Sequence, residues 1–212
     1  MTVKLIIQNR IIIVSFIVVI AIISHSCGKT FYIFGSQSRS GFYTYNGQGS
    51  GSFNNQSSVD WKPTPGMQIG LATDIANINK YLSIKTELNT SLQGARYEDV
   101  SNRIKGSIDL LYIYVPIEIR FYHKIGIYGE AGLQPGYLIS ARDRVKWKSS
   151  YFNDYITKWD FGMTGGLGYE FKNHIGIGLS VFQGFSNISV AKNDGKSNNI
   201  VALRATYRLR MK

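Results

Sequence analysis

Apolar and polar residues alternate along most of the chain after about residue 66, which is the period of a β-strand with two different faces. In residues 110–122 the odd positions from Leu111 to Phe121 are apolar, whereas the even positions include Glu118 and Arg120. A helical period is sustained nowhere in this part of the chain. The pattern therefore predicts an all-β protein.

The alternation divides the chain into eight segments. Six are clear (81–93, 110–122, 125–140, 159–171, 175–185 and 201–209) and two are weaker (67–74 and 31–36). Pro116 and Pro135 each remove a backbone donor from their strand but leave its alternation intact. An even number of alternating segments of about ten residues is typical of a transmembrane β-barrel, in which the apolar face contacts lipid.

The connections between these segments alternate between long and short. Long connections are predicted at about 37–65, 94–107, 141–157 and 188–198, and short ones at 76–80, 123–124 and 172–173. Outer-membrane barrels have long external loops and short periplasmic turns. A soluble lipocalin-like binding protein is the alternative, but it needs an apolar interior and has no reason for strict alternation. We therefore expect an eight-stranded antiparallel up-and-down transmembrane β-barrel.

The first 26 residues have the composition of a secretory signal peptide. Lys4 and Arg10 flank the start of an apolar run over 11–23, and small polar residues precede Cys27. The run is short for a transmembrane helix, which needs about 20 apolar residues. A signal peptide over 1–26 and a barrel domain over 27–212 are therefore favoured. An uncleaved anchor over 5–23 and a lipidated Cys27 are the alternatives.

The polar faces of the strands place charged residues inside such a barrel. The nine expected lumen residues are Lys85, Glu87, Glu118, Arg120, Glu130, Asp160, Glu170, Arg204 and Arg208. Their charges nearly balance, and charges enclosed in a narrow space must pair. The interior of an eight-stranded barrel is just wide enough to be filled by its own side chains. We expect a structural ion-pair network that plugs the lumen, with a narrow pore as the alternative.

The chain is basic, with 24 Lys and Arg against 13 Asp and Glu. Many of the basic residues fall in the predicted external loops, where the phosphates of lipopolysaccharide are the nearest polyanion. The candidate lipopolysaccharide contacts are Arg96, Arg103, Lys105, Arg142, Arg144, Lys146 and Lys148. The scattered charge, without a recognition helix or stacking platform, argues against nucleic acid as a partner.

Aromatic residues near the predicted strand ends suit the membrane interfaces, where outer-membrane barrels carry aromatic girdles. The candidates are Tyr81, Tyr122, Tyr137, Trp159, Tyr169 and Tyr207.

The sequence offers little for catalysis. One Cys excludes a disulfide framework and a Cys-rich zinc module. His123 and His174 fall at predicted short turns, whereas Ser91 and Ser140 lie near outer strand ends. A barrel enzyme that modifies lipid A with His and Ser is therefore the less favoured alternative. No catalytic residue, metal or cofactor is expected, and the protein is predicted not to be an enzyme.

Four motifs in order support a family resemblance. They are YLSIKTEL at 81–88, YIYVPI at 112–117, YGEAGLQPGYL at 128–138, and DFG with GGLGYE at 160–170. Together they resemble the PorT-like outer-membrane β-barrel family over most of the chain after about residue 66. Two features depart from it: residues 31–36 lack the glycine-rich first strand, and the chain ends on basic residues rather than an aromatic.

The resemblance implies a fold and an outer-membrane location more than an activity. Some relatives support a secretion apparatus for cell-surface proteins. The resemblance therefore implies outer-membrane lipid, and other secretion or envelope proteins, as partners. No catalytic residue is implied.

Overall fold

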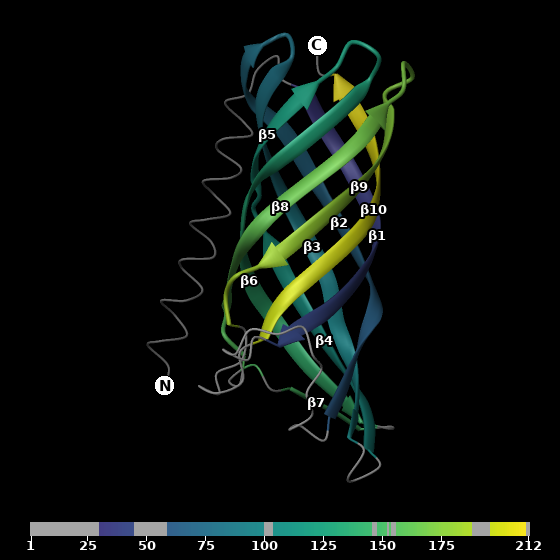
Figure 1. Cartoon of the computed structure of the whole chain (residues 1–212), viewed down its shortest axis with the longest axis vertical. Helices are drawn as coiled ribbons and strands as arrows, with labels where there is room; N and C mark the ends of the chain where they lie inside the picture. The colour runs from purple at the N-terminus through teal and green to yellow at the C-terminus, as the bar shows by residue number, and fades with distance from the viewer. Residues whose placement is uncertain are drawn as a thin grey trace.

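The computed structural model describes residues 30–44, 59–99, 104–145, 148–151, 153, 156–187 and 196–210. The predicted signal peptide over 1–26 and the alternatives at Cys27 lie outside these residues. Within the described ranges, no helix is long and apolar enough to cross a membrane. The regular structure that they contain is β-strand (Figure 1).

The strands follow one another around a closed ring. Their bounds are β1 Thr30–Thr44, β2 Val59–Asn79, β3 Leu82–Asp99, β4 Ile104–Tyr114, β5 Ile117–Tyr122, β6 Ile127–Val145, β7 Lys148–Tyr151, β8 Trp159–Glu170, β9 Ile175–Gly184 and β10 Lys196–Arg210. The paired strands are antiparallel, and the first pairs with the last from Thr30↔Arg210 to Thr44↔Lys196. This pairing closes the barrel and leaves its wall without a free edge.

The ten strand segments make up the eight staves of the barrel, each of which we call a wall. β4 and β5 are two parts of one wall, because both pair with β3 on one side and β6 on the other. The break between them falls at Val115 and Pro116, where the proline has no N–H to donate. The neighbouring strand β3 still bonds the chain at the break, since the N–H of Glu87 donates to the Pro116 carbonyl at 3.1 Å. β7 only extends one side of β6, so the predicted eight-stranded up-and-down barrel is confirmed.

The two ends of the barrel differ in the length of their connections. Short turns link β2 to β3, β5 to β6 and β8 to β9 at one end, the upper end in Figure 1. At the other end the connections cover residues 45–58, 100–103, 152–158 and 185–195, so three of the four are longer than the turns and the one between β3 and β4 is as short as they are. Short turns mark the periplasmic side of an outer-membrane barrel, so we call the upper end of Figure 1 the periplasmic end and the lower end the outer end.

The predicted long loops are too wide, and the predicted first strand over 31–36 is too short. β1 continues to Thr44 and β2 begins at Val59, so the loop predicted at 37–65 shrinks from both sides. In the same way, residues 94–99 pair with residues 104–109, so most of the loop predicted at 94–107 is strand. β6 and β7 enter the loop predicted at 141–157, and β10 enters the one at 188–198. Backbone pairing continues beyond the lipid band, where no apolar face is needed and the alternation fades.

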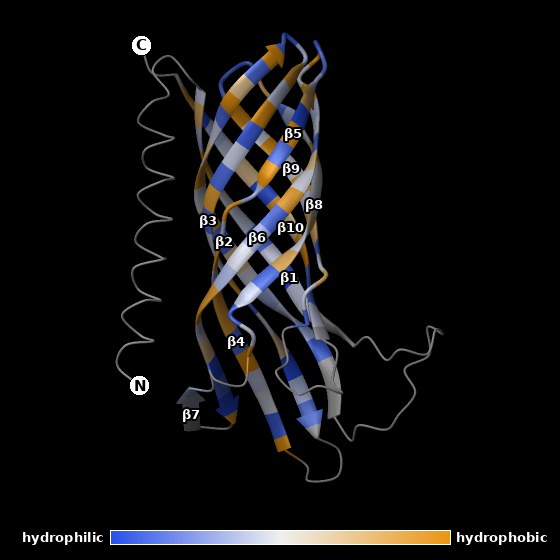
Figure 2. Cartoon of the chain, turned by 90° about the vertical axis from the view of Figure 1, so that its left-hand side faces the viewer, coloured by the Kyte–Doolittle hydropathy of each residue, from blue (hydrophilic) through white to orange (hydrophobic). Residues whose placement is uncertain are grey.

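The outward face of the barrel is apolar and the inward face is largely polar. Ile117, Ile119 and Phe121 are 53%, 57% and 52% exposed, whereas Glu118 and Arg120 are 3% and 2% exposed. The ribbon colours in Figure 2 alternate between hydrophobic and hydrophilic residues along the strands. This is the reverse of a soluble barrel with an apolar interior, so the structure excludes the lipocalin-like alternative.

An apolar cluster also lies inside the barrel toward its outer end, which the alternation did not predict. Its buried members are Leu110, Tyr112, Tyr114, Leu138, Ala141, Phe182, Ile200 and Ala202. A register shift in the pairing of β4 with β6, between Leu111 and Tyr112, contributes to it. Leu138 and Ser140 pair with adjacent residues there, so Ile139 is an extra residue, and beyond it the odd-numbered Ala141 is buried.

Candidate functional site in the barrel lumen

Six of the nine predicted lumen residues meet in one buried group, which we call the lumen ion cluster. It consists of Lys85 and Glu87 on β3, Glu118 and Arg120 on β5, Glu130 on β6 and Arg204 on β10. Each of the six is at most 7% exposed. Three positive charges meet three negative charges, so the cluster is neutral.

The strand register brings the first members together. Lys85 on β3 lies opposite Glu118 on β5, and Arg120 lies opposite Glu130 on β6. Residues two apart on one strand share a face, so Glu87 joins Lys85 on the inner side. Local alternation and pairing between neighbouring strands thus account for five of the six residues.

Lys85 is the centre of the cluster. Its Nζ lies 2.6 Å from a carboxylate oxygen of Glu87, and 2.7 Å from one each of Glu118 and Glu130. Carboxylate oxygens of these three glutamates lie within 4.8 Å of one another, a spacing that also suits a metal ion. The lysine ammonium already contacts all three carboxylates, so the chain supplies its own cation at this position.

Arg204 joins the cluster from another part of the ring. β10 is separated from β3 by β1 and β2, and from β6 by β9 and β8. Arg204 Nη2 lies 2.6 Å from Glu87 Oε2, and its Nη1 lies 3.2 Å from Glu130 Oε1. Its guanidinium carbon lies 4.1 Å from the centre of the Phe34 ring. The side chain therefore crosses the lumen and ties three walls together.

Glycines on β8 and β9 leave room for the cluster. A Cβ on Gly166 would lie 3.2 Å from Glu130 Oε1, and one on Gly168 would lie 2.4 Å from the hydroxyl oxygen of Tyr128. Tyr128 in turn faces Arg120, whose guanidinium carbon is 4.6 Å from its ring centre. β8 and β9 contribute no charged group to the cluster, and their glycines contribute space instead.

Asp160 lies inside the barrel but outside the lumen ion cluster. One carboxylate oxygen, Oδ2, accepts hydrogen bonds from Tyr114 Oη and Asn198 Nδ2, both at 2.8 Å. Tyr114 Oη also accepts a bond of 2.9 Å from Gln93 Nε2. No basic side chain of the described residues forms an ion pair with Asp160. We call this group the aspartate layer, and the expectation that Asp160 would join the ion pairs is wrong.

A second polar group lies on the periplasmic side of the cluster. The hydroxyls of Tyr32 and Tyr122 are 2.8 Å apart, and Tyr32 also donates to Asp74 at 3.2 Å. Ser83 donates to the other oxygen of Asp74, at 3.0 Å. We call this group, Tyr32, Tyr122, Asp74 and Ser83, the tyrosine layer. Along β3, Ser83 of the tyrosine layer precedes the cluster residues, and Gln93 of the aspartate layer follows them. Polar side chains therefore cross the lumen at three successive levels.

Glu170 and Arg208 also stand apart from the cluster. Arg208 Nη1 lies 2.8 Å from Glu170 Oε1 near the periplasmic end. The Arg208 Nε donates to His174 Nδ1 at 3.2 Å. His174 lies in the turn between β8 and β9 and has a φ of 70°. The two residues pair with each other, as their charges suggest, but at the rim of the barrel rather than in its middle.

The structure describes four of the seven predicted lipopolysaccharide contacts with their side chains. Arg96, Lys105, Arg142 and Arg144 are exposed at the outer end, whereas Arg103, Lys146 and the side chain of Lys148 lie outside the described residues. Three of the four described residues already have partners. Lys105 pairs with Glu98 at 2.8 Å, Arg144 pairs with Asp109, and Arg142 lies over Tyr151 with 4.7 Å to the ring centre.

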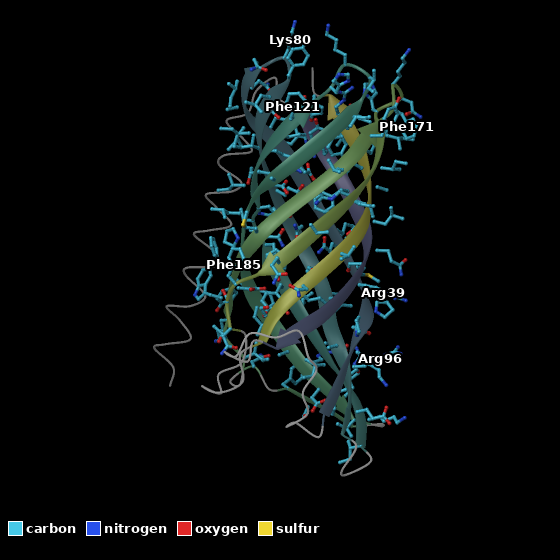
Figure 3. All side chains as sticks on the ribbon, in the orientation of Figure 1. Arg39, Lys80, Arg96, Phe121, Phe171 and Phe185 are labelled. Carbon is cyan, nitrogen blue, oxygen red and sulfur yellow. The ribbon has the colours of Figure 1, made fainter. Side chains whose placement is uncertain are left out.

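The hydrogen bond from Lys105 lowers the pKa of Glu98, which lies at the tip of the β3–β4 hairpin. Arg39 is a further exposed cation on the outer part of β1 that the sequence reading missed. It fell in the loop predicted at 37–65, whereas it belongs to a strand and points outward (Figure 3).

Most predicted girdle residues do reach the membrane-facing surface. Trp159, Tyr169 and Tyr207 are 57%, 38% and 48% exposed, and Tyr137 packs edge-on against Trp159 with 5.1 Å between ring centres. Tyr81 is half-buried beside its turn. Tyr122 is the exception, because its hydroxyl bonds Tyr32 and accepts from Arg120 inside the lumen. It occupies an even position of its strand, and that face points inward.

The histidines lie far from the serines of the outer end. His123 and His174 belong to turns at the periplasmic end, and Ser91 is buried in the lumen, where it accepts from Gln68. In the described part of the chain, no His and Ser are brought together by a hydrogen bond. The described residues therefore do not form the His and Ser pair expected of a barrel that modifies lipid A.

A closed barrel with an apolar outer wall and a charged, filled interior defines a small integral outer-membrane protein. The outer membrane protein beta-barrel domain family matches residues 35–190, well over half of the chain. The chain belongs to this family, and its place is the outer membrane. No curated protein matches the chain.

Several solved structures resemble it at low identity. Ail of Yersinia pestis, in complex with the heparin analogue sucrose octasulfate, is 15% identical, with 85% of this chain and 99% of that chain covered and a TM-score of 0.48. Neisserial surface protein A is 11% identical, with 85% and 97% covered and a TM-score of 0.48. OprG of Pseudomonas aeruginosa is 11% identical, with 87% and 97% covered and a TM-score of 0.43.

Proposed function

We propose that this protein is a closed outer-membrane barrel with a structural or accessory role, and that it is neither a channel nor an enzyme. The observation that carries the proposal is the neutral lumen ion cluster. Arg204 reaches from β10 to Glu87 on β3 and Glu130 on β6, so ion pairs cross the interior between distant walls.

Ions would need to break these contacts in order to pass. A buried charge that loses its partner is strongly unfavourable, at about 3 to 5 kcal/mol for a broken buried pair. The aspartate layer and the tyrosine layer add hydrogen-bonded barriers on either side of the cluster. A narrow pore therefore requires a concerted rearrangement of side chains at three levels.

We propose further that the accessory role is support of protein secretion at the cell surface. The ordered motifs at 81–88, 112–117, 128–138 and 160–170 support this assignment, since they resemble those of the PorT-like barrels. In this account the protein is exported by the signal peptide over 1–26. Its exposed outer basic residues, Arg96 and Arg142 among them, contact lipopolysaccharide phosphates, which bind Arg through charge-assisted hydrogen bonds.

Cells of the native host with and without the gene provide the test. We expect the loss of the gene to reduce a set of secreted proteins at the cell surface, measured by surface proteomics, and to leave the uptake of small solutes unchanged. Normal surface proteins with altered solute uptake would support a pore instead. A changed acyl count in intact lipid A, measured by mass spectrometry, would support an enzyme.

A further inference from the structure

The periplasmic end carries a ring of lysines that form no ion pair with the residues that the structure describes. Each of the three short turns presents one exposed lysine: Lys80 between β2 and β3, Lys124 between β5 and β6, and Lys172 between β8 and β9. We call these three residues the periplasmic lysine rim. Turns that are distant in sequence thus place the same charge at the same end of the barrel.

Acidic side chains are almost absent around the rim. Over residues 75–84, 121–129 and 169–178 the single acid is Glu170. That carboxylate is occupied by Arg208, at 2.8 Å, and its side chain is only 11% exposed. None of the rim lysines forms an ion pair within the described residues. His123 and His174, on two of the same turns, add no negative charge.

The outer end has a different charge arrangement. There Lys62 and Lys105 both approach Glu98, at 3.5 Å and 2.8 Å, and Arg144 pairs with Asp109. Cations at the outer end are therefore partly neutralised by the protein itself. Among the described residues the periplasmic lysine rim has no such counter-charge, so it is open to an anion from outside the chain.

Apolar residues beside the lysines fix the height of the rim in the membrane. Ile78 and Ile125, each within two positions of a rim lysine, are 57% and 59% exposed. Phe121 and Phe171 are 52% and 41% exposed, and Figure 3 shows both near the periplasmic end, lower than Lys80. Exposed aromatic and aliphatic side chains favour the acyl and interfacial regions of the bilayer.

The lysine ammonium groups therefore extend to the headgroups of the periplasmic leaflet. Lys80 shows the arrangement, since its Nζ lies 4.9 Å from the centre of the adjacent Tyr81 ring at the turn. A lysine stem rests along the apolar surface while its charge reaches the polar layer. Basic residues at this height are attracted by anionic lipid, with about 1 kcal/mol for each charge.

We propose that the periplasmic lysine rim binds the phosphate headgroups of anionic phospholipids in the inner leaflet of the outer membrane. The inference rests on the outer-membrane placement of the barrel and is independent of whether the lumen conducts. Three lysines on separate turns surround the barrel, so they hold a shell of anionic lipid at several points of its circumference. This lipid contact is separate from the lipopolysaccharide contacts proposed at the outer end.

Amide chemical shifts of the folded, ¹⁵N-labelled protein in uncharged maltoside micelles test the proposal. Short-chain phosphatidylglycerol is titrated as the probe, and short-chain phosphatidylcholine is the neutral-headgroup control. We expect phosphatidylglycerol to give saturable shifts at amides 79–82, 123–126 and 172–175. High salt should abolish them, because exposed charge pairs are screened.

Two triple variants sharpen the test. Lys80→Gln/Lys124→Gln/Lys172→Gln should weaken the apparent affinity at each turn by about fivefold, since each turn loses one charge worth about 1 kcal/mol. The matched control Lys62→Gln/Arg96→Gln/Lys105→Gln removes three cations from the outer end and should leave the turn shifts unchanged. All six positions are exposed, so both variants should keep the wild-type spectrum elsewhere.

Three results would overturn the proposal. Equal turn shifts with phosphatidylcholine would show that the phosphate charge is not recognised. Unchanged affinity in the rim variant would show that the lysines do not bind the lipid. Turn shifts with a soluble, carboxylate-bearing muropeptide but none with phosphatidylglycerol would assign the rim to the cell wall.

Discussion

Arg204 and Glu87 form a two-pronged ion pair across the barrel lumen, although 117 positions separate them in the sequence. Arg204 Nη1 donates to Glu87 Oε1 at 2.8 Å and its Nη2 donates to Oε2 at 2.6 Å. Parallel bonds of this kind are among the strongest that an arginine makes, and they fix the geometry of both partners. The pair therefore holds β10 and β3 in one arrangement, and in the proposed function it also helps to close the lumen.

The first prediction concerns the loss of this pair. Arg204→Met should lower the free energy of unfolding by about 3 to 5 kcal/mol, because Glu87 loses its bidentate partner in a buried site. The matched control is Leu203→Ala on the same strand, which is 63% exposed to the lipid side. Urea unfolding in lipid vesicles, followed by tryptophan fluorescence, measures both. Similar losses in the two variants would contradict a buried, strongly coupled pair.

A double-mutant cycle separates the pair from its surroundings. Arg204→Met combined with Glu87→Met removes opposite charges together, so the double variant should be more stable than the sum of the single losses predicts. We expect a coupling energy of about 1 to 3 kcal/mol, the upper part of the range for contacting residues. Additive losses would mean that the two side chains act independently in the folded protein.

The third prediction contrasts two buried carboxylates. Glu87→Gln should be strongly destabilising, because Lys85 and Arg204 both lose a charged partner. Asp160→Asn should cost less than about 1.5 kcal/mol, the typical value of one net hydrogen bond, because the described residues give Asp160 no cation to abandon. The same unfolding assay ranks the two. If Asp160→Asn lowers the free energy of unfolding as much as Glu87→Gln does, Asp160 has a cationic partner and this contrast is wrong.

The fourth prediction concerns the space that glycine provides. On β8, a Cβ at Gly168 would meet the Tyr128 hydroxyl at 2.4 Å, whereas one at Gly165 would have nothing closer than a backbone oxygen at 3.5 Å. Gly168→Ala should therefore destabilise the barrel by about 1 to 3 kcal/mol through overpacking. Gly165→Ala should change stability little. If the two substitutions have equal effects, the lumen has more free space than the packing around Tyr128 indicates.

Alternation in the sequence was sufficient to predict which face each strand turns inward. It placed Glu118 and Arg120 in the lumen and Ile117 and Ile119 on the lipid side, and the structure has them there. It failed beyond the register shift between Leu111 and Tyr112, where the odd-numbered Ala141 is buried although odd positions of this strand were expected to face outward. Face periodicity carries no information about such an offset, because a bulge depends on pairing with another strand.

The partners inside the lumen were harder to predict than the faces. Alternation put Asp160 and Arg204 on inner faces, but it does not give their height along the barrel. Height depends on the stagger of strands that are far apart in sequence. The structure consequently places Arg204 in the lumen ion cluster, and Asp160 with Tyr114 and Asn198 in a separate layer. The assignment to PorT-like barrels, within the wider family, stays a prediction.

Planar-bilayer recording on the purified wild-type barrel tests the central claim most directly. If the lumen ion cluster closes the interior, the protein should insert and show no stable unitary conductance at moderate voltage. Insertion is checked independently, by the heat-modifiable gel migration of the folded barrel recovered from the same vesicles. Reproducible unitary current steps from correctly folded protein would contradict the closed lumen and favour the narrow pore.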